Sequence, residues 1–201
     1  SFGLTKLGAG TVILTGDNSS AYTTTLISGG TLQIGSGSTT GTLGSGAVTN
    51  NANLSFNRSN SMTVANGISG SGAVNQIGSG TTVFSTANTY LGATSITNGT
   101  LSVTNAAAIN IASALTINGG TLDINGVTLN TLTTAPSIQG AGSSTLGAIT
   151  GTNTAGYGGP ITLAAATSIG GAGTLTLGGT LSGSFGLTKL GAGTVILTGD
   201  N

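Results

Sequence analysis

Side chains that could carry out acid–base chemistry are rare in this sequence. Among 201 residues, three are Lys or Arg, three are Asp or Glu, and none is His or Cys. Glycoside hydrolysis uses two carboxyl groups about 5 to 9.5 Å apart, whereas Asp17 and Asp123 lie in different halves of the chain. A Ser nucleophile would have no His, Glu or Cys beside it to act as a base. We therefore predict that the chain is not an enzyme.

Cofactor and metal sites are not predicted either. A hard cation needs several oxygen ligands, usually with more than one carboxylate, and we interpret Asp17 beside Asn18 as a turn-capping pair. Glycine pairs such as Gly8 and Gly10 do not extend to the dinucleotide-binding pattern G-x-G-x-x-G. With a net charge of zero there is no basic patch for nucleic acid, and no apolar run reaches the ~18 residues of a membrane span.

Five other residues could contact a ligand. Lys6 and Arg58 could bind an anion, and Tyr22, Tyr90 and Tyr157 could stack on sugars. For the cations we favour a solvated or Asp-paired role, and for the tyrosines a half-buried position at a corner of the fold.

The first 18 residues of the sequence recur at its end. The segment SFGLTKLGAGTVILTGDN occupies residues 1–18 and, letter for letter, residues 184–201. We interpret residues 1–183 as one full unit of a tandem array and residues 184–201 as the start of the next identical unit. If the array is one continuous solenoid, we expect the second copy to occupy the same place on its surface, displaced along the axis with at most a small rotation.

Short strands account for most of the chain. Small polar and large apolar residues alternate in TVILT (residues 11–15), TLQI (31–34), TLSV (100–103) and TLTL (174–177), and Gly, Asn or Ser flanks each segment. This period of two predicts strands of four or five residues. Only in the Ala-rich stretch 105–113 is a helix an alternative to strands and turns.

A Gly-Thr-Leu motif sets the predicted coil length. It begins at Gly30, Gly99, Gly120 and Gly173. The step from Gly99 to Gly120 is the shortest of the three, and the step from Gly30 to Gly99 is three times a coil of similar length. A coil of about 20 to 23 residues that stacks on its neighbours is typical of a β-solenoid. Eight or nine such coils would fill the unit 1–183.

The predicted fold is all-β, a right-handed parallel β-helix, because parallel crossovers are overwhelmingly right-handed. Its inward apolar residues would form one continuous column. The core candidates are Leu32, Ile34, Phe56, Phe84, Leu101, Val103, Leu122, Ile124, Leu175 and Leu177.

Three parts of the sequence resemble a known repeat. The segments GLTKLGAGTVILTGDN, ISGGTLQIG and NTYLGATSITNGTLSV are similar to the autotransporter-associated β-strand repeats of bacterial passenger domains and large surface adhesins. Close matches run from Leu4 to Asn18 and from Leu187 to Asn201, and a looser one runs from residue 75 to 103 with Gln76 at the usual Lys position. The resemblance implies an extracellular or cell-surface β-helix that acts as a stalk or adhesive fibre.

These observations predict a non-catalytic structural protein. Its expected partners are identical neighbouring repeats stacked coaxially, further copies packed laterally into bundles, and surface glycans. The alternative is a binding module whose flat Thr/Ser/Asn face recognises carbohydrate or, less readily, ice. Ice binding would need regular Thr-x-Thr ranks, and the candidates at 23–25 and 174–176 are scattered.

Overall fold

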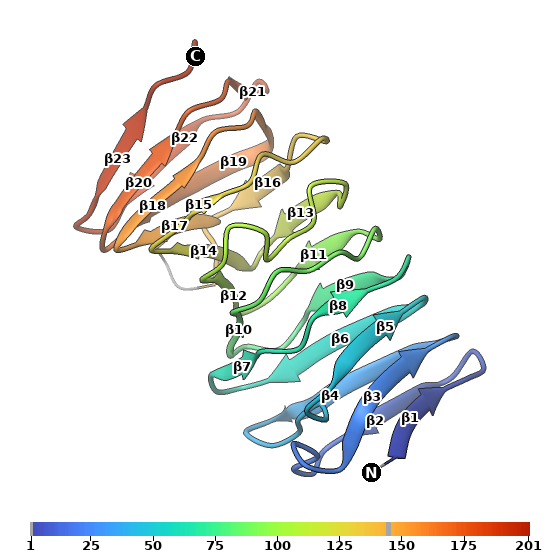
Figure 1. The fold of residues 1–201 in the computed structure, drawn as a ribbon. Helices are drawn as coiled ribbons and strands as arrows, with labels where there is room; N and C mark the ends of the chain where they lie inside the picture. The colour runs from blue at the N-terminus through green and yellow to red at the C-terminus, as the bar shows by residue number, and fades with distance from the viewer. Residues whose placement is uncertain (1, 144–145) are drawn as a thin grey trace.

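The chain folds into stacked parallel coils. The structure, a computed structural model, describes residues 2–143 and 146–201. Over these residues it contains 23 strands and no helix, and every strand pairing is parallel. The result is a β-solenoid of about ten turns, as the sequence predicts, with the N-terminal coil at one end and the C-terminal coil at the other (Figure 1).

Each coil passes in turn over three faces, which we number in chain order. Face 1 begins with β1 (Phe2–Lys6), β3 (Tyr22–Ile27), β5 (Ala47–Asn50) and β8 (Ile68–Ser69), and ends with β15 (Thr128–Leu129), β18 (Thr154–Tyr157), β20 (Thr174–Leu177) and β23 (Thr194–Leu197).

Faces 2 and 3 belong to one sheet, because the long strand β19 (Ile161–Gly171) turns the corner between them. Face 2 contains β2 (Thr11–Leu14), β4 (Thr31–Ser38), β6 (Asn53–Arg58), β9 (Ala73–Gln76), β11 (Thr94–Ile96), β13 (Leu115–Asn118), β16 (Ser137–Gly140), the start of β19 and β21 (Leu181–Ser182). Face 3 contains β7 (Met62–Val64), β10 (Thr81–Phe84), β12 (Thr100–Val103), β14 (Thr121–Asn125), β17 (Ile149–Thr152), the end of β19 and β22 (Leu187–Leu190).

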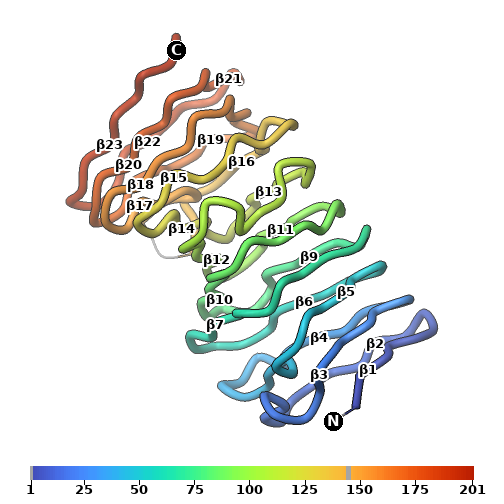
Figure 2. Tube along the Cα trace, in the orientation of Figure 1, coloured from blue at the N-terminus to red at the C-terminus, as the bar shows by residue number. Residues whose placement is uncertain are grey.

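Irregular rungs connect the two halves of face 1 between β8 and β15. The hydrogen bonds that join them are Thr89 N to Ile68 O (2.8 Å), Asn88 N to Ala107 O (2.9 Å) and Asn130 N to Ala106 O (2.9 Å). The Ala-rich stretch 105–113 is one of these rungs and forms turns. The tube in Figure 2 follows the same stacked path from end to end.

Coil lengths agree with the predicted range at most steps. Along face 2, Thr11 lies opposite Thr31, Thr31 opposite Asn53 and Asn53 opposite Ala73. Each of these steps falls within the predicted coil length. The step from Ser137 to its partner Thr162 is longer than predicted.

The Gly-Thr-Leu motifs do not form one column, and the spacing argument from them was wrong in part. Leu101 and Leu122 are direct partners on face 3, so their spacing is one coil. Leu32 lies on face 2 and Leu175 on face 1, so the stretch from Gly30 to Gly99 spans three coils and one further face. The motif encodes a corner followed by a strand, and such a unit fits any corner of a three-sided coil.

The core is one column of stacked apolar side chains. All ten core candidates named from the sequence are buried, and each exposes at most 1% of its surface. Phe56 and Phe84 meet edge to face with ring centroids 5.7 Å apart, a favourable aromatic geometry. The outward column on face 2 is polar and uncharged; it runs through Gln33, Ser55, Asn75, Ser95, Thr116 and Ser137.

We expect stability to depend on the inward residues of each strand. Replacing Leu32, which is fully buried, by Ala should lower the free energy of unfolding by about 2 to 5 kcal/mol, since a cavity remains in the packed column. The adjacent Thr31→Ala should cost much less. Urea denaturation measures both, and equal losses would show that the strand faces are assigned wrongly.

Candidate functional site

The repeated segment is the candidate functional site, because the structure contains it in two different surroundings. The first copy, residues 1–18, contributes β1 and β2 and contacts only the coil that follows it, β3–β4. The second copy, residues 184–201, contributes β22 and β23 and contacts only the coil that precedes it, β19–β20. Together the two copies show what the segment contacts on each of its two sides.

The coil before the segment and the coil after it present the same inward pattern. In the first copy the facing pairs are Leu4–Thr25, Lys6–Ile27, Val12–Leu32 and Leu14–Ile34. In the second copy they are Leu187–Thr167, Lys189–Ile169, Val195–Leu175 and Leu197–Leu177. The segment is therefore built to lie between two coils that each offer a Thr, an Ile and two large aliphatic residues.

Each copy leaves its other side open in this structure. Val12 exposes 40% and Leu197 44% of their surfaces, although both occupy inward positions. A cleft of about 250 Å³, lined by Ile169, Leu187, Lys189, Val195 and Leu197, lies at the C-terminal end of the core. In the first copy, β3 and β4 cover the equivalent surface. In this structure, these apolar residues at inward positions have a neighbouring coil on one side only.

Lys6 closes the corner between β1 and β2. Its side chain points inward and exposes only 4% of its surface. The Nζ atom donates hydrogen bonds to the carbonyl oxygens of Leu7 (2.7 Å), Gly8 (2.7 Å) and Gly29 (2.8 Å), which uses all three donors of the ammonium group. The expectation of a solvated or Asp-paired cation was wrong for Lys6, because a carbonyl of the next coil completes its coordination.

The equivalent residue of the second copy lacks that coil. Lys189 Nζ donates to the carbonyl of Gly191, the counterpart of Gly8, and the side chain remains exposed. Gln76 occupies the related position at another corner: it is buried, and its Nε2 donates to the carbonyls of Gly78 (2.8 Å) and Gly80 (3.3 Å). A side-chain N–H donor at this position is therefore the common feature.

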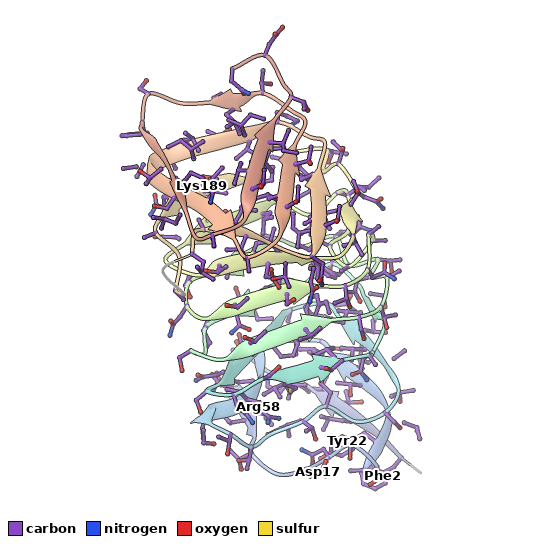
Figure 3. All side chains as sticks on the ribbon, turned by 90° about the vertical axis from the view of Figure 1, so that its left-hand side faces the viewer. Phe2, Asp17, Tyr22, Arg58 and Lys189 are labelled. Carbon is purple, nitrogen blue, oxygen red and sulfur yellow. The ribbon has the colours of Figure 1, made fainter. Side chains whose placement is uncertain are left out.

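Arg58 is also a structural residue. Its guanidinium donates to the carbonyls of Gly41 (2.7 Å) and Thr39, and its Nε donates to Asn60 Oδ1 (3.0 Å). It fixes the loop after β4 to the next coil. In Figure 3, Arg58 lies among the N-terminal coils and Lys189 at the opposite end of the molecule.

The tyrosine rings offer little surface for stacking on a sugar. Tyr90 is fully buried and its hydroxyl lies 2.7 Å from Thr94 Oγ1; burial raises the pKa of Tyr90 to about 12. Tyr157 is buried as well, and burial raises its pKa too. Tyr22 packs edge to face against Phe2 with ring centroids 5.6 Å apart. The sequence predicted half-buried tyrosines, whereas Tyr90 and Tyr157 are buried.

The aspartates accept hydrogen bonds from hydroxyl groups and backbone. Asp17 Oδ1 accepts from Ser19 N (2.9 Å) and Thr42 Oγ1 (3.1 Å), and the backbone bond from Ser19 is the main cause that lowers the pKa of Asp17. This is the turn-capping role expected from the sequence.

Asp123 belongs to a separate hydroxyl cluster on face 3. It accepts from Ser102 Oγ (2.9 Å), Thr152 Oγ1 (2.8 Å) and Thr150 Oγ1 (3.2 Å). About five coils separate it from Asp17 along the face, which corresponds to about 24 Å at ~4.8 Å per coil. This separation is too large for Asp17 and Asp123 to act as a carboxyl pair, and among the described residues no three His, Cys, Asp or Glu side chains come together.

The two copies lie on different faces, and this was not expected. In the first copy β1 lies on face 1 and β2 on face 2, whereas in the second β22 lies on face 3 and β23 on face 1. The period from residue 1 to residue 184 therefore spans eight coils and two further faces. The prediction that the second copy occupies the same place on the surface was wrong, because the period is not a whole number of coils.

Glycines at the corner let neighbouring coils approach closely. A Cβ atom built on Gly193 would lie well under 3.0 Å from the carbonyl oxygen of Gly173, whereas one built on Gly10, its counterpart in the first copy, meets nothing within 4 Å. The same residue in the same sequence is thus covered in one copy and open in the other.

This difference gives a matched pair of variants. Gly193→Ala should displace the last coil from β20, because the new methyl group would collide with a backbone carbonyl, whereas Gly10→Ala should leave the fold and its stability unchanged. Hydrogen exchange of residues 187–197 measures the effect, and we expect faster exchange only in the first variant. Equal protection of this segment in both variants would contradict the stacking described here.

Stability should respond to alkali through Tyr90. The folded state retains the phenol proton up to about pH 12, while the unfolded chain loses it near pH 10. The free energy of unfolding should therefore fall by roughly 2 to 3 kcal/mol between about pH 10 and 12. Tyr90→Phe should flatten this fall in urea titrations, and an unchanged slope would contradict the assignment.

None of the described residues forms a helix long and apolar enough to cross a membrane. Comparison with curated proteins and with solved structures gave no match. A family model, the passenger-associated-transport-repeat, matches residues 4–34, 74–103 and 187–201. These ranges include residues 4–18 and 187–201 of the two copies, β3 and the start of β4, and the corner of Gln76, which confirms the resemblance to autotransporter passenger repeats. The three matched segments, which together make up less than half of the chain, are similar to the passenger-associated-transport-repeat family.

Proposed function

We propose that this chain is a non-catalytic structural segment of a bacterial extracellular or cell-surface passenger, in which tandem units stack coaxially into a shaft or filament. The observation that carries the proposal is the position of the second copy. Residues 187–190 and 194–197 continue the solenoid on β19 and β20 in the same parallel register as every earlier coil. A following unit therefore begins without a break in the core.

The chemistry of the surface supports the same role. Only six residues are charged, and the two cations Lys6 and Arg58 donate to backbone carbonyls. The outward column of face 2 from Gln33 to Ser137 consists of Ser, Thr, Asn and Gln, so little repulsion opposes the lateral packing of shafts into bundles. Weak contacts to surface glycans fit the same hydroxyl-rich faces, although Tyr90 and Tyr157 are buried and give no aromatic platform.

The proposal predicts how length depends on the number of units. A chain of three successive units, each equivalent to residues 1–183, should form a single rod that lengthens by about 42 Å for each added unit, from eight and two-thirds coils at ~4.8 Å. Small-angle scattering and electron microscopy measure this length. Units joined as separate globules, or a rod of unchanged length, would contradict the proposal.

A further inference from the structure

We propose that Asn98, in the corner between β11 and β12, is a site of spontaneous deamidation. The peptide nitrogen of Gly99 attacks the side-chain amide of Asn98, and the residue converts to aspartate and isoaspartate. The inference does not depend on the proposed function, because it concerns one corner inside the solenoid and not the way in which units join.

Four asparagines of the chain precede a glycine, and these are Asn66, Asn98, Asn118 and Asn125. Attack by the next peptide nitrogen is least hindered in such a pair, because glycine has no Cβ atom to shield its nitrogen. The sequence alone therefore offers four candidate sites of the same kind, and the structure must distinguish between them.

In three of the four pairs, another coil holds the asparagine side chain. The hydrogen bonds run from Asn66 Nδ2 to the carbonyl oxygens of Gly44 and Gly46, from Gln139 Nε2 to Asn118 Oδ1, and from Asn153 Nδ2 to Asn125 Oδ1. The nitrogen of Gly126 is also bound, to the carbonyl oxygen of Thr152 (3.0 Å). Rotation of these side chains toward the next peptide nitrogen would break the bonds between coils.

The side chain of Asn98 is directed at its own neighbour. Gly99 N donates to Asn98 Oδ1 (2.9 Å), so the carbon bonded to that oxygen lies close to the nitrogen that must attack it. Among the described residues, Gly99 N has no partner in another coil, and loss of its proton breaks no bond of the ladder. Asn98 is exposed, so water and hydroxide reach it.

The reaction uses only the chain, hydroxide and water. Hydroxide removes the amide proton of Gly99, and the nitrogen forms a bond to Asn98 Cγ, which closes a succinimide ring. The bond from Cγ to Nδ2 then breaks, and the side-chain nitrogen takes up a proton and leaves as ammonia. Water opens the ring at Cγ to give aspartate, or at the backbone carbonyl carbon to give isoaspartate, whose main chain runs through Cβ and Cγ.

Isoaspartate would not fit this corner. Its main chain is longer by a methylene group, whereas Thr97 N and Thr100 N on either side are bound to Gln76 O (3.0 Å) and Gly80 O (2.9 Å) of the preceding coil. A Cβ atom on Gly99 would collide with carbonyl oxygens of that coil, so there is no room for an extra atom. We therefore expect the corner to separate from the coil beneath it.

The test compares the four sites in the folded chain and in the chain unfolded by urea, both at mildly alkaline pH. Peptide mass spectrometry measures conversion of each amide to the acid, and hydroxylamine, which cleaves a succinimide, identifies the bond after Asn98. The unfolded chain should react at similar rates at all four sites. Folding should slow Asn66, Asn118 and Asn125 at least about tenfold more than Asn98, because a displacement of about 1 Å from the attack geometry can cost on the order of a hundredfold in rate. A smaller difference, or stronger protection of Asn98, would overturn the proposal.

Matched variants separate the chemistry from its structural effect. Gly29, Gly119 and Ala172 precede the glycines that begin the other Gly-Thr-Leu motifs at Gly30, Gly120 and Gly173, so Asn98→Ala should fold normally and remain intact on incubation. Freshly prepared Asn98→Asp carries the charge of the product on an unchanged main chain. Hydrogen exchange of residues 97–100 should be slow in both variants and fast in the isolated isoaspartyl chain. Slow exchange in the isoaspartyl chain would overturn the expected loss of the corner.

Discussion

The structure depends on parallel backbone hydrogen bonds between successive coils, which hold neighbouring chains ~4.8 Å apart. At this distance some corner positions leave no room for a side chain. A Cβ atom on Gly30, whose φ is 65°, would collide with the carbonyl oxygen of Gly10. Glycine is therefore required at this corner, and the large aliphatic core residues lie on the flat faces between corners. The same spacing makes like charges costly, because each outward residue lies directly over its counterpart in the next coil.

Corners leave backbone carbonyls without a strand partner, and the chain satisfies them with side-chain donors. Lys6 binds three such carbonyls and Gln76 binds two. The ammonium group is stabilised by oriented peptide dipoles in place of an acidic partner, so a buried cation is compatible with a sequence that has only three Asp residues. In this chain, Lys6 of the repeated segment therefore closes a corner, and backbone carbonyls take the place of a counter-ion.

Alternation of small and large residues was sufficient to predict the strands and the buried set, because Leu32, Leu101, Leu122 and Leu175 point inward whichever face they occupy. It was not sufficient to assign the faces, since three corners of similar shape accept the same Gly-Thr-Leu unit. Lys6 could not be placed from local sequence, because Gly29, which completes its coordination, belongs to the next coil. The exposure of Val12 and Leu197 was equally inaccessible to prediction, because it depends on their place in the first and last coils of the structure and not on the local pattern.

The period from residue 1 to residue 184 covers eight coils and two further faces, so the same residue would lie on a different face in successive units of an array. Ile13 points outward from face 2, and its counterpart Ile196 points outward from face 1, opposite Thr176. In successive units the same side chain would therefore appear on each face in turn and return to the first after three units. A lateral partner would meet a similar mixture of residues on all three faces. Such a shaft can pack against neighbours from any side, whereas a period of whole coils would confine each residue to one face.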